Sequence, residues 1–288
     1  MKHKALFVGL TTIDIQYFIK ELPESNTKLK TTAPEILVGG PATNAAVAFA
    51  YLNKSAILAS PTGYNAFEKL VHNDFKSVGI THFDLANKQL FSPVYATVLT
   101  SENGDRTIIT HNPNDTESVV SANELIEKVN PEILLIDGFY PEFSSMCARI
   151  CAQKGIPVVA DCGSWKPQFF DLLDSVEIAI CSADFMPPEC NTKSDLFNFM
   201  KNKGVQKIAI SNGGEQLVFQ NGTEGAININ PIQVKDTLGA GDFLHGAFCY
   251  YYLLYNDFTI ALKKASGLAT FTCSFYGTRE WLKFKHDA

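Results

Sequence analysis

Short apolar runs alternate with longer helix-like segments along most of the chain. Turn residues bound each run, and each run has the length of a strand. These runs are residues 5–10, 56–60, 133–137, 157–161, 178–181 and 207–211. Segments with helical spacing lie between most of them, at 42–52, 66–77, 122–129, 142–154, 194–203, 240–255 and 260–275. This alternation predicts an α/β fold whose central sheet is mainly parallel.

Two regions, 13–37 and 93–111, interrupt the alternation. In the second, two apolar runs flank Asn103 and Gly104, which supply the positive φ angles of a tight turn, so a β-hairpin is expected there. An isolated ribbon cannot bury both faces, so we expect it to pack over another part of the molecule. A further hairpin is expected at one edge of the sheet, with strands at 217–221 and 226–230.

Composition restricts the class of protein. With 288 residues and 46% hydrophobic content, the chain can form one large domain or two small ones. The net charge of −6 disfavours nucleic acid and anionic membranes as partners. Seven cysteines without a Cys-x-x-Cys pair favour reduced core thiols over disulfides or zinc. The apolar run near the N-terminus is too short for a signal peptide, and no 18-residue apolar stretch follows, so the cytoplasm is expected.

The segment 236–242, Asp-Thr-Leu-Gly-Ala-Gly-Asp, places small residues and a carboxylate at the start of a predicted helix. Backbone N–H groups of Gly239, Ala240 and Gly241 can approach a ligand closely, and a helix N-terminus favours anions. Asp242 would repel a resting phosphate, so it is better suited to act as the base for an attacking hydroxyl. The alternative is a simple glycine turn capped by Asp236 or Asp242.

The same segment resembles the C-terminal signature of the ribokinase (PfkB) family of sugar and nucleoside kinases, Asp-Thr-x-Gly-Ala-Gly-Asp, without a mismatch. The resemblance implies a ribokinase-like α/β fold, with Asp242 as catalytic base and residues 239–241 as the anion hole for the transferred phosphoryl group. The chain has no Walker-type P-loop, and Leu244 stands where a dinucleotide-binding turn would need a third glycine.

A second motif, Gly39-Gly40 with Asn44 four residues later, opens a helix of small residues. The glycines allow close backbone approach, and the amide can donate and accept toward hydroxyls. The motif resembles the family's N-terminal signature, which implies acceptor binding by Gly39, Gly40 and Asn44. Asp14 follows the first strand, where open α/β sheets bind ligands, and the resemblance makes it an acceptor-hydroxyl ligand. The alternatives are a glycine turn with Pro41 near the helix start and a surface aspartate.

The hairpin sequence around Arg106, Gly-Asp-Arg-Thr-Ile, resembles that of ketohexokinases, and Leu238 in the C-terminal motif is also typical of them. Arg106 is therefore a candidate substrate or phosphate ligand, although a solvated hairpin arginine is equally compatible with the sequence. Pro41 stands where ketohexokinases carry an asparagine. Pro41 and His245 together resemble sulfofructose kinases to a comparable degree.

Nucleotide-binding candidates follow from weaker matches. Ser211 and Gly213 end a predicted strand and resemble the family's Thr-x-Gly-x-x-Gly, with Gln216 in place of the last glycine; a simple β-turn is the alternative. Lys166 lies in a segment that corresponds to the family's Asp-x-Asn-x-Arg. Gly277 matches the glycine that follows the helix beside the adenine.

The metal site departs from the family's pattern. Ser182 to Phe185 replace the expected Asn-x-x-Glu, which leaves Asp184 as a weak candidate. Mg²⁺ with ATP is still expected, because the transferred phosphate needs charge neutralisation.

The sequence therefore predicts a single ribokinase-like domain over residues 1–288. We expect an ATP-dependent kinase of a small sugar-like alcohol, with a ketose or ketose derivative favoured as the acceptor. By resemblance, insertions 13–37 and 93–111 form a small β lid that is often shared in a homodimer. Two alternatives remain: a nucleoside kinase of the same fold, and a sugar-binding sensor that has lost turnover.

Overall fold

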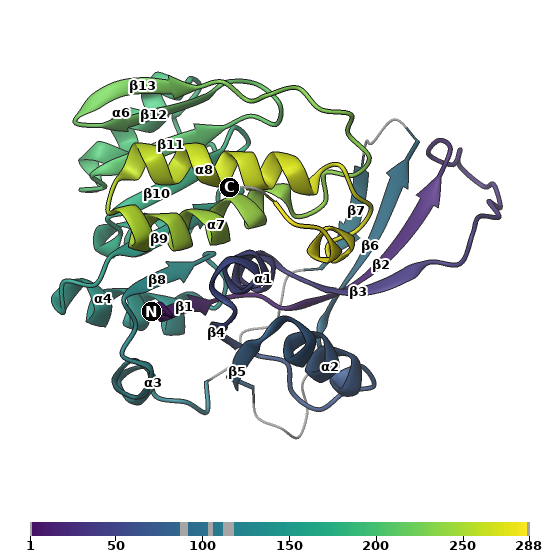
Figure 1. Cartoon of the computed structure of the whole chain (residues 1–288), viewed down its shortest axis with the longest axis horizontal. Coiled ribbons are helices and arrows are strands. Elements are labelled where there is room, and N and C mark those ends of the chain that lie inside the picture. The colour runs from purple at the N-terminus through teal and green to yellow at the C-terminus, as the bar shows by residue number, and fades with distance from the viewer. Residues whose placement is uncertain (1, 87–91, 103–105, 112–117, 287–288) are drawn as a thin grey trace.

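The computed structural model describes residues 2–86, 92–102, 106–111 and 118–286, and they form two sheets (Figure 1). The larger sheet has nine strands in the order β13-β12-β11-β10-β9-β8-β1-β4-β5. Seven of these are parallel: β5 (Ile80–Asp84), β4 (Ala56–Ser60), β1 (Ala5–Val8), β8 (Ile133–Ile136), β9 (Val158–Cys162), β10 (Ile178–Ser182) and β11 (Lys207–Ser211). Two antiparallel strands, β12 (Leu217–Asn221) and β13 (Thr223–Ile227), complete one edge.

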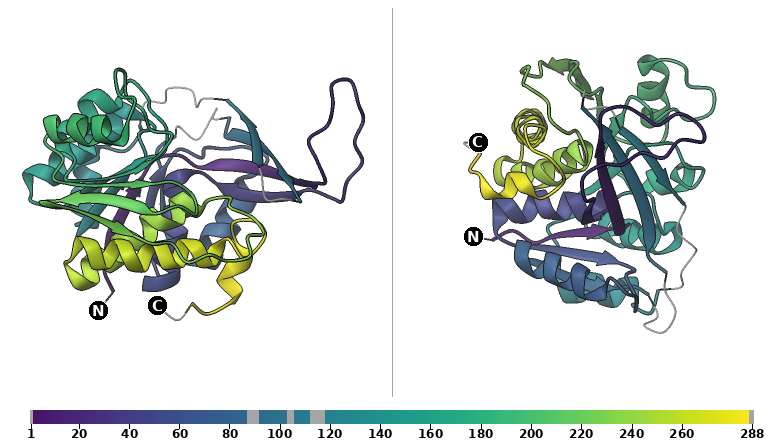
Figure 2. Two further views of the ribbon diagram at one scale, coloured as in Figure 1. Left: turned by 90° about the horizontal axis from the view of Figure 1, so that it is seen from above. Right: turned by 90° about the vertical axis from the view of Figure 1, so that its right-hand side faces the viewer.

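Helices cover both faces of this sheet (Figure 2). On one face lie α1 (Pro41–Asn53), α2 (Glu68–Val78), α7 (Ala240–Tyr255) and α8 (Phe258–Thr272). On the other lie α3 (Ala122–Val129), α4 (Pro141–Gln153), α5 (Phe169–Leu172) and α6 (Lys193–Asn202). The residues of β1 are all apolar because both faces of the strand are buried. Phe7 packs against the helices on one face of the sheet, and Leu6 packs against those on the other. A parallel strand buried on both faces needs such a continuous apolar run.

Two expectations about strands need correction. Strand β5 was not predicted, because only Ile80 of its five residues is buried and its polar content hides the pattern. The second strand of the edge hairpin is Thr223–Ile227 rather than 226–230. Gly222, with φ of 74°, makes the turn alone, so Asn221 pairs with Thr223. Gly225 lies inside the strand, where a Cβ atom would overlap the ring of Phe219.

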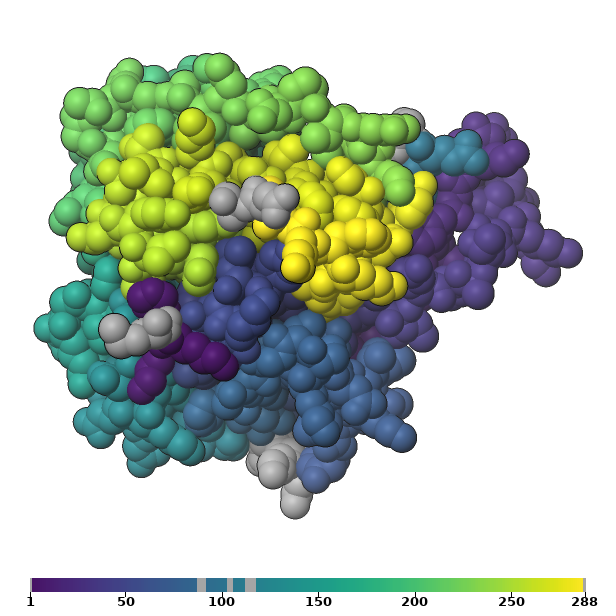
Figure 3. All heavy atoms as spheres, in the orientation of Figure 1, coloured from purple at the N-terminus to yellow at the C-terminus, as the bar shows by residue number. Residues whose placement is uncertain are grey.

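The interrupting regions form a second sheet, hereafter the small sheet. Its strands, in the order β3-β2-β6-β7, are β3 (Glu35–Gly39), β2 (Thr12–Ile19), β6 (Val94–Ser101) and β7 (Arg106–Thr110). Strands β6 and β7 are antiparallel, as the predicted hairpin requires; its turn at Asn103 and Gly104 lies outside the described residues. Figure 3 shows the small sheet, in purple and blue, projecting beyond the C-terminal segment in yellow.

A buried amide connects the small sheet to the rest of the molecule. Gln16 of β2 has no exposed surface, and its Nε2 donates to Asp236 Oδ2 at 2.7 Å and to Thr100 Oγ1 at 2.9 Å. Asp236 Oδ2 also accepts from the N–H of Gly277, and Asp236 Oδ1 accepts from the N–H of Leu238. One carboxylate thus joins β2, the loop before α7 and the C-terminal segment.

The state of the cysteines and the character of the helices bear on two further expectations. All seven cysteines are free thiols, and six of them are buried. In the described part of the chain, no helix combines the length and apolar character needed to cross a membrane.

Candidate active site

The N-terminus of α7 forms the centre of the site. Gly239 precedes the helix with φ of 76°, a conformation that favours glycine, and its carbonyl accepts from the N–H of Phe243 at 2.8 Å. The N–H of Ala240 donates to the Thr237 carbonyl within the turn. Helix geometry leaves the N–H groups of Gly241 and Asp242 without intrahelical acceptors, and Gly241 borders open space. An anion can therefore approach the first turn.

Asp242 is half-buried in that first turn and accepts a hydrogen bond from Asn44 Nδ2 at 2.9 Å. Burial raises the pKa of Asp242 to about 7, and the nearby carboxylate of Asp161 contributes to the rise. The hydrogen bond from Asn44 and the charge of His245 act in the opposite direction. A carboxyl group that titrates near neutrality is well matched to proton transfer.

Two further carboxylates lie at the carboxyl ends of neighbouring strands. Asp137, directly after β8, accepts from the N–H groups of Leu10, Ala42 and Phe139 at 2.8, 3.1 and 3.0 Å. It thereby satisfies the first turn of α1, whose N-cap Gly40 has no side chain. Burial raises the pKa of Asp137 to about 6. This is the switch point of the sheet, because the chain runs outward in opposite directions from β1 and β8.

Asp161 of β9 lies beside His245 of α7, with 3.5 Å between Oδ1 and Nε2. The two ring nitrogens of His245 also face carbonyls, Nδ1 that of Gly241 at 2.6 Å and Nε2 that of Ile180 at 3.0 Å. The ring of His245 is buried and connects α7 to β10, so it packs beneath the candidate site rather than lining it. The other carboxylate oxygen, Asp161 Oδ2, is buried and has no partner among the described residues.

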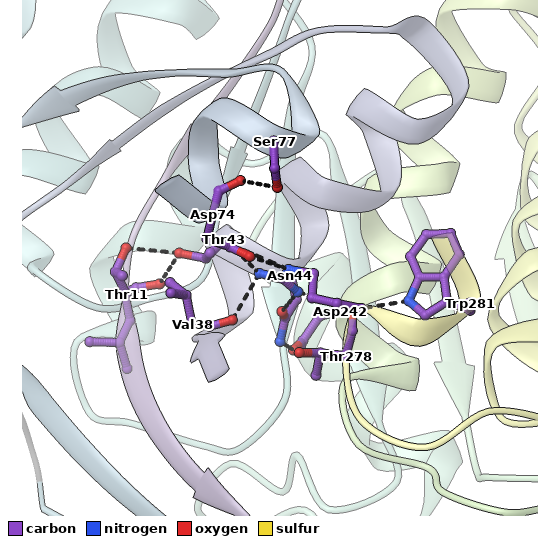
Figure 4. A network of polar contacts seen from close by, with 11 residues as sticks. Thr11, Val38, Thr43, Asn44, Asp74, Ser77, Asp242, Thr278 and Trp281 are labelled. Carbon is purple, nitrogen blue, oxygen red and sulfur yellow. Dashed lines mark hydrogen bonds and ion pairs between the residues drawn. The ribbon is translucent and has the colours of Figure 1, made fainter. Parts of the chain in front are cut away.

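Asn44 joins two halves of a polar network (Figure 4). Its Nδ2 donates to Asp242, and its Oδ1 accepts from Arg279 Nη1 at 3.1 Å. Arg279 also forms an ion pair with Asp74 of α2, with 2.9 Å between Nη2 and Oδ2. Sequence reasoning missed both Arg279 and Asp74. The only available signal was a lone arginine two residues after Gly277, and nothing in the sequence connects that position to Asn44 or α2.

The predicted acceptor residues Asp14, Gly39, Gly40 and Asn44 lie close to one another. Asp14 is buried, which raises its pKa, while a hydrogen bond from Thr12 and the charge of Arg279 oppose the rise. A Cβ atom on Gly39 would overlap Asp14 Oδ2, and one on Gly40, where φ is 101°, would overlap the Leu10 carbonyl. The glycine pair is thus needed for packing between β2, β3 and α1.

Other predicted site residues lie farther from this centre. Arg106 is exposed on β7, and its charge acts on Cys273 at the end of α8. The ammonium group of Lys166 lies 4.3 Å from the ring centre of Phe139 and acts on Asp137. Gly277 has φ of 63° and donates to Asp236 rather than facing open space.

Ser211 is the last residue of β11 and Gly213 follows it by two residues, on the same edge of the sheet as Asp137 and Asp161. Gly213 has no neighbouring atom within 4 Å of the position that a Cβ atom would take. Asp184 is exposed just beyond β10. Across residues 2–86, 92–102, 106–111 and 118–286, no three His, Cys, Asp or Glu side chains gather into a metal-binding group.

Comparisons with known proteins identify the family and the fold of the chain. The model of the "pfkB family carbohydrate kinase" matches residues 2–283. A deoxyribokinase of Salmonella typhi is 23% identical over 291 residues, which cover 94% of this chain and 93% of that protein. The ribokinase structure from Thermotoga maritima superimposes with a TM-score of 0.78 at 18% identity, covering 98% of each chain. Ribokinase of Arabidopsis thaliana, solved with ribose and ATP, gives 0.73 at 21% identity and covers 99% of this chain and 100% of that one. The expected ribokinase-like fold is confirmed.

Proposed function

Because the chain belongs to the pfkB family of carbohydrate kinases, we propose that Asp242 is the base of an ATP-dependent phosphoryl transfer to a sugar hydroxyl. The hydroxyl proton passes to the Asp242 carboxylate while the hydroxyl oxygen forms a bond to the γ-phosphorus. The bond between that phosphorus and the bridging oxygen breaks, and ADP leaves with the electron pair. The N–H groups of Gly239 and Gly241 and the dipole of α7 stabilise the charge on the transferring group.

The single observation that carries this proposal is the environment of Asp242. Its carboxyl group lies in the first turn of α7 beside the small residues 239–241, accepts from Asn44, and has a pKa raised to about 7. A helix N-terminus stabilises the charged form of an aspartate that only caps it, so the pKa of such a residue would lie below its ordinary value. The raised pKa instead matches a group that must accept a proton near neutral pH.

The residues present fit a nucleotide that brings its own magnesium ion. Mg²⁺ is commonly held by one or two carboxylates, water and substrate phosphates rather than by a protein cage. Asp161 Oδ2, buried and unpartnered among the described residues, offers one acceptor near Asp242. Bound Mg²⁺ would neutralise charge on the phosphates. Ser211, Gly213 and Lys166 are our candidates for the nucleotide side.

For the acceptor, we assign Asp14, Gly39, Gly40 and Asn44 as the ligands of a small sugar-like substrate. The residues around Arg106 favour a ketose or a ketose derivative. The deoxyribokinase and ribokinase relatives make aldopentoses the competing class. Both classes of sugar present adjacent hydroxyls to a carboxylate and an amide, so Asp14 and Asn44 do not distinguish them. Our preference for a ketose over an aldopentose rests on the resemblance of the sequence around Arg106 to that of ketohexokinases.

The small sheet is our candidate for a lid that pairs across a homodimer. Ile36, Ile108 and Ile109 are large apolar side chains on its strands, each at least 45% exposed. Exposed apolar side chains on strands favour contact with another sheet. The mass of the protein in solution, with and without Ile109→Lys, tests this assembly.

A coupled assay of ADP release tests the function against ketoses, ribose, deoxyribose, other aldoses, phosphosugars, sulfosugars and nucleosides. We expect sugar-dependent ADP release that Asp242→Asn abolishes. Faster turnover of a nucleoside than of every sugar would replace the proposal with a nucleoside kinase. Thermal stabilisation by a sugar, with no ADP release from the wild-type protein, would replace it with a sensor. Faster turnover of ribose or deoxyribose than of any ketose would reject the ketose preference alone.

A further inference from the structure

The guanidinium group of Arg279 uses all five of its N–H donors within the protein. Nε and Nη2 donate to the two carboxylate oxygens of Asp74 at 3.0 and 2.9 Å. Nη2 also donates to the Val38 carbonyl at 2.8 Å, and Nη1 donates to the Thr278 carbonyl at 3.0 Å and to Asn44 Oδ1 at 3.1 Å. Such a bidentate and saturated arrangement fixes the side chain and leaves no donor for a substrate anion.

These contacts determine which way the Asn44 amide faces. An asparagine amide can turn by 180°, which exchanges its oxygen and its NH₂ group. Because Arg279 can only donate, the oxygen must face it, and the NH₂ group then faces Asp242 at 2.9 Å. The turned amide would place two donors together at Arg279 and two acceptors together at Asp242. The turned orientation of the amide is therefore disfavoured by Arg279 at one end and by Asp242 at the other.

We propose that Arg279 is a positioning residue, which holds the Asn44 amide so that its NH₂ group donates to Asp242. Asp74 anchors Arg279 from α2, which completes a chain of contacts from α2 through α1 to α7 (Figure 4). This inference rests on the proposed role of Asp242. It adds a function for Arg279 and Asp74, two residues to which the proposed reaction assigns no part.

The surroundings of Asp242 give this contact its weight. Asp161 of β9 and Asp137 beyond β8 are carboxylates that oppose ionisation, as does burial. Among the described residues, His245 of α7 and the amide of Asn44 favour the charged form, as does the N-terminus of α7. If the amide is no longer held, a favourable contact is lost, and Asp242 keeps its proton to a higher pH.

The test is the pH dependence of kcat/KM between pH 5.5 and 9. Arg279→Lys keeps the charge but cannot reach Asn44, Asp74 and Val38 together, and Arg279→Met removes both charge and donors. Asp74→Asn releases the anchor without altering Arg279 itself. Arg149→Met on α4, an exposed arginine, is the matched control. We expect an acid limb near pH 7 in the wild type and the control. In both Arg279 variants this acid limb should move upward by about one pH unit, as the loss of a hydrogen bond to a charged group implies.

Each outcome decides the inference. An unchanged limb in folded Arg279 variants overturns it, because a residue with only a structural role lowers stability or kcat without moving the limb. A limb that moves in Arg279→Met but not in Arg279→Lys also overturns it, since charge rather than orientation then acts. If the wild type turns over no acceptor, the proposed function fails separately, and the side-chain amide resonances of Asn44 provide the test. They should follow a titration near pH 7 in the wild type and lose it in Arg279→Lys; retention would overturn the inference.

Discussion

Gly39 and Asp14 lie so close together that a Cβ atom on Gly39 would overlap the Oδ2 atom of Asp14. The two residues belong to paired strands, β3 and β2, and Thr12, which lies opposite Gly39, donates to Asp14 Oδ1 at 2.6 Å. The absence of a side chain at Gly39 therefore determines where the Asp14 carboxylate lies. Burial raises the pKa of Asp14, so displacement of the carboxylate toward solvent would lower that pKa.

Gly39→Ala should displace Asp14 and weaken acceptor binding. We expect KM for the acceptor to rise by about tenfold or more and the free energy of unfolding to fall by about 1–3 kcal/mol, because the added methyl group overpacks a buried contact. Steady-state kinetics and thermal melts provide the measurements. Gly214→Ala is the control, since no atom lies within 4 Å of its added Cβ atom. Wild-type KM and melting temperature in Gly39→Ala would contradict this reading.

Asp242→Ala should lower kcat by about 10²-fold or more while acceptor binding is retained, the scale expected for loss of a positioned general base. The measurements are ADP release at saturating acceptor and calorimetric binding of the same acceptor. Asp171→Ala, which removes an exposed carboxylate on α5, should leave both unchanged. Full turnover in Asp242→Ala would remove this residue from the mechanism.

Asp242→Asn should make the folded protein more stable than the wild type at pH 8 and less so, or not at all, at pH 5. The pKa of Asp242 is about 7 in the folded protein and near its ordinary 3.8 in the unfolded chain. Between these values the folded state holds a proton that the unfolded state releases, so wild-type stability falls as pH rises from about 4 to about 7. Asparagine does not ionise and lacks this loss. A difference in melting temperature that stays constant over this range would refute the shift.

Deoxy analogues of the true acceptor should react poorly. Asp14 and Asn44 are both buried, so removal of a hydroxyl that either one binds leaves a polar group unpaired. The expected loss in kcat/KM is about 10⁴-fold or more, whereas a sugar that is only tolerated loses much less. Kinetics with each singly deoxygenated sugar separate the two cases. A loss of less than tenfold at every position would indicate that the sugar tested is not the substrate.

Local signals in the sequence were sufficient for part of the fold and the site. The predicted helix at 240–255 agrees with the structure, because Gly239 at its start and the apolar residues after Asp242 are neighbours in the chain. Six of the seven parallel strands were evident as well, since each is a mostly buried apolar run of neighbouring residues. Strand β5 was missed because it lies at the edge of the sheet, where polar residues such as His82 and Asp84 are accommodated.

Long-range partners could not be predicted from one sequence. Asn44 and Arg279 are 235 residues apart, and Asp137 meets Leu10 across 127 residues. Nothing beside Asp137 indicates that it would satisfy the first turn of α1, because its contacts depend on how β1 and β8 come together. Arg279 could be interpreted as a solvated arginine until the position of Asp74 was known. The motifs indicated the groups to which we assign the reaction, and the tertiary structure identified the residues that contact those groups.

The hydrogen bonds of Asp236 have a mechanical consequence. The same carboxylate oxygen accepts from Gln16 of the small sheet and from Gly277, while the other oxygen holds Leu238 in the loop that leads to α7. A movement of the small sheet away from the molecule would therefore disturb the carboxylate that also holds the loop preceding Asp242. If the small sheet closes over the acceptor as we propose, its movement and the position of the loop before Asp242 are linked through the carboxylate of Asp236.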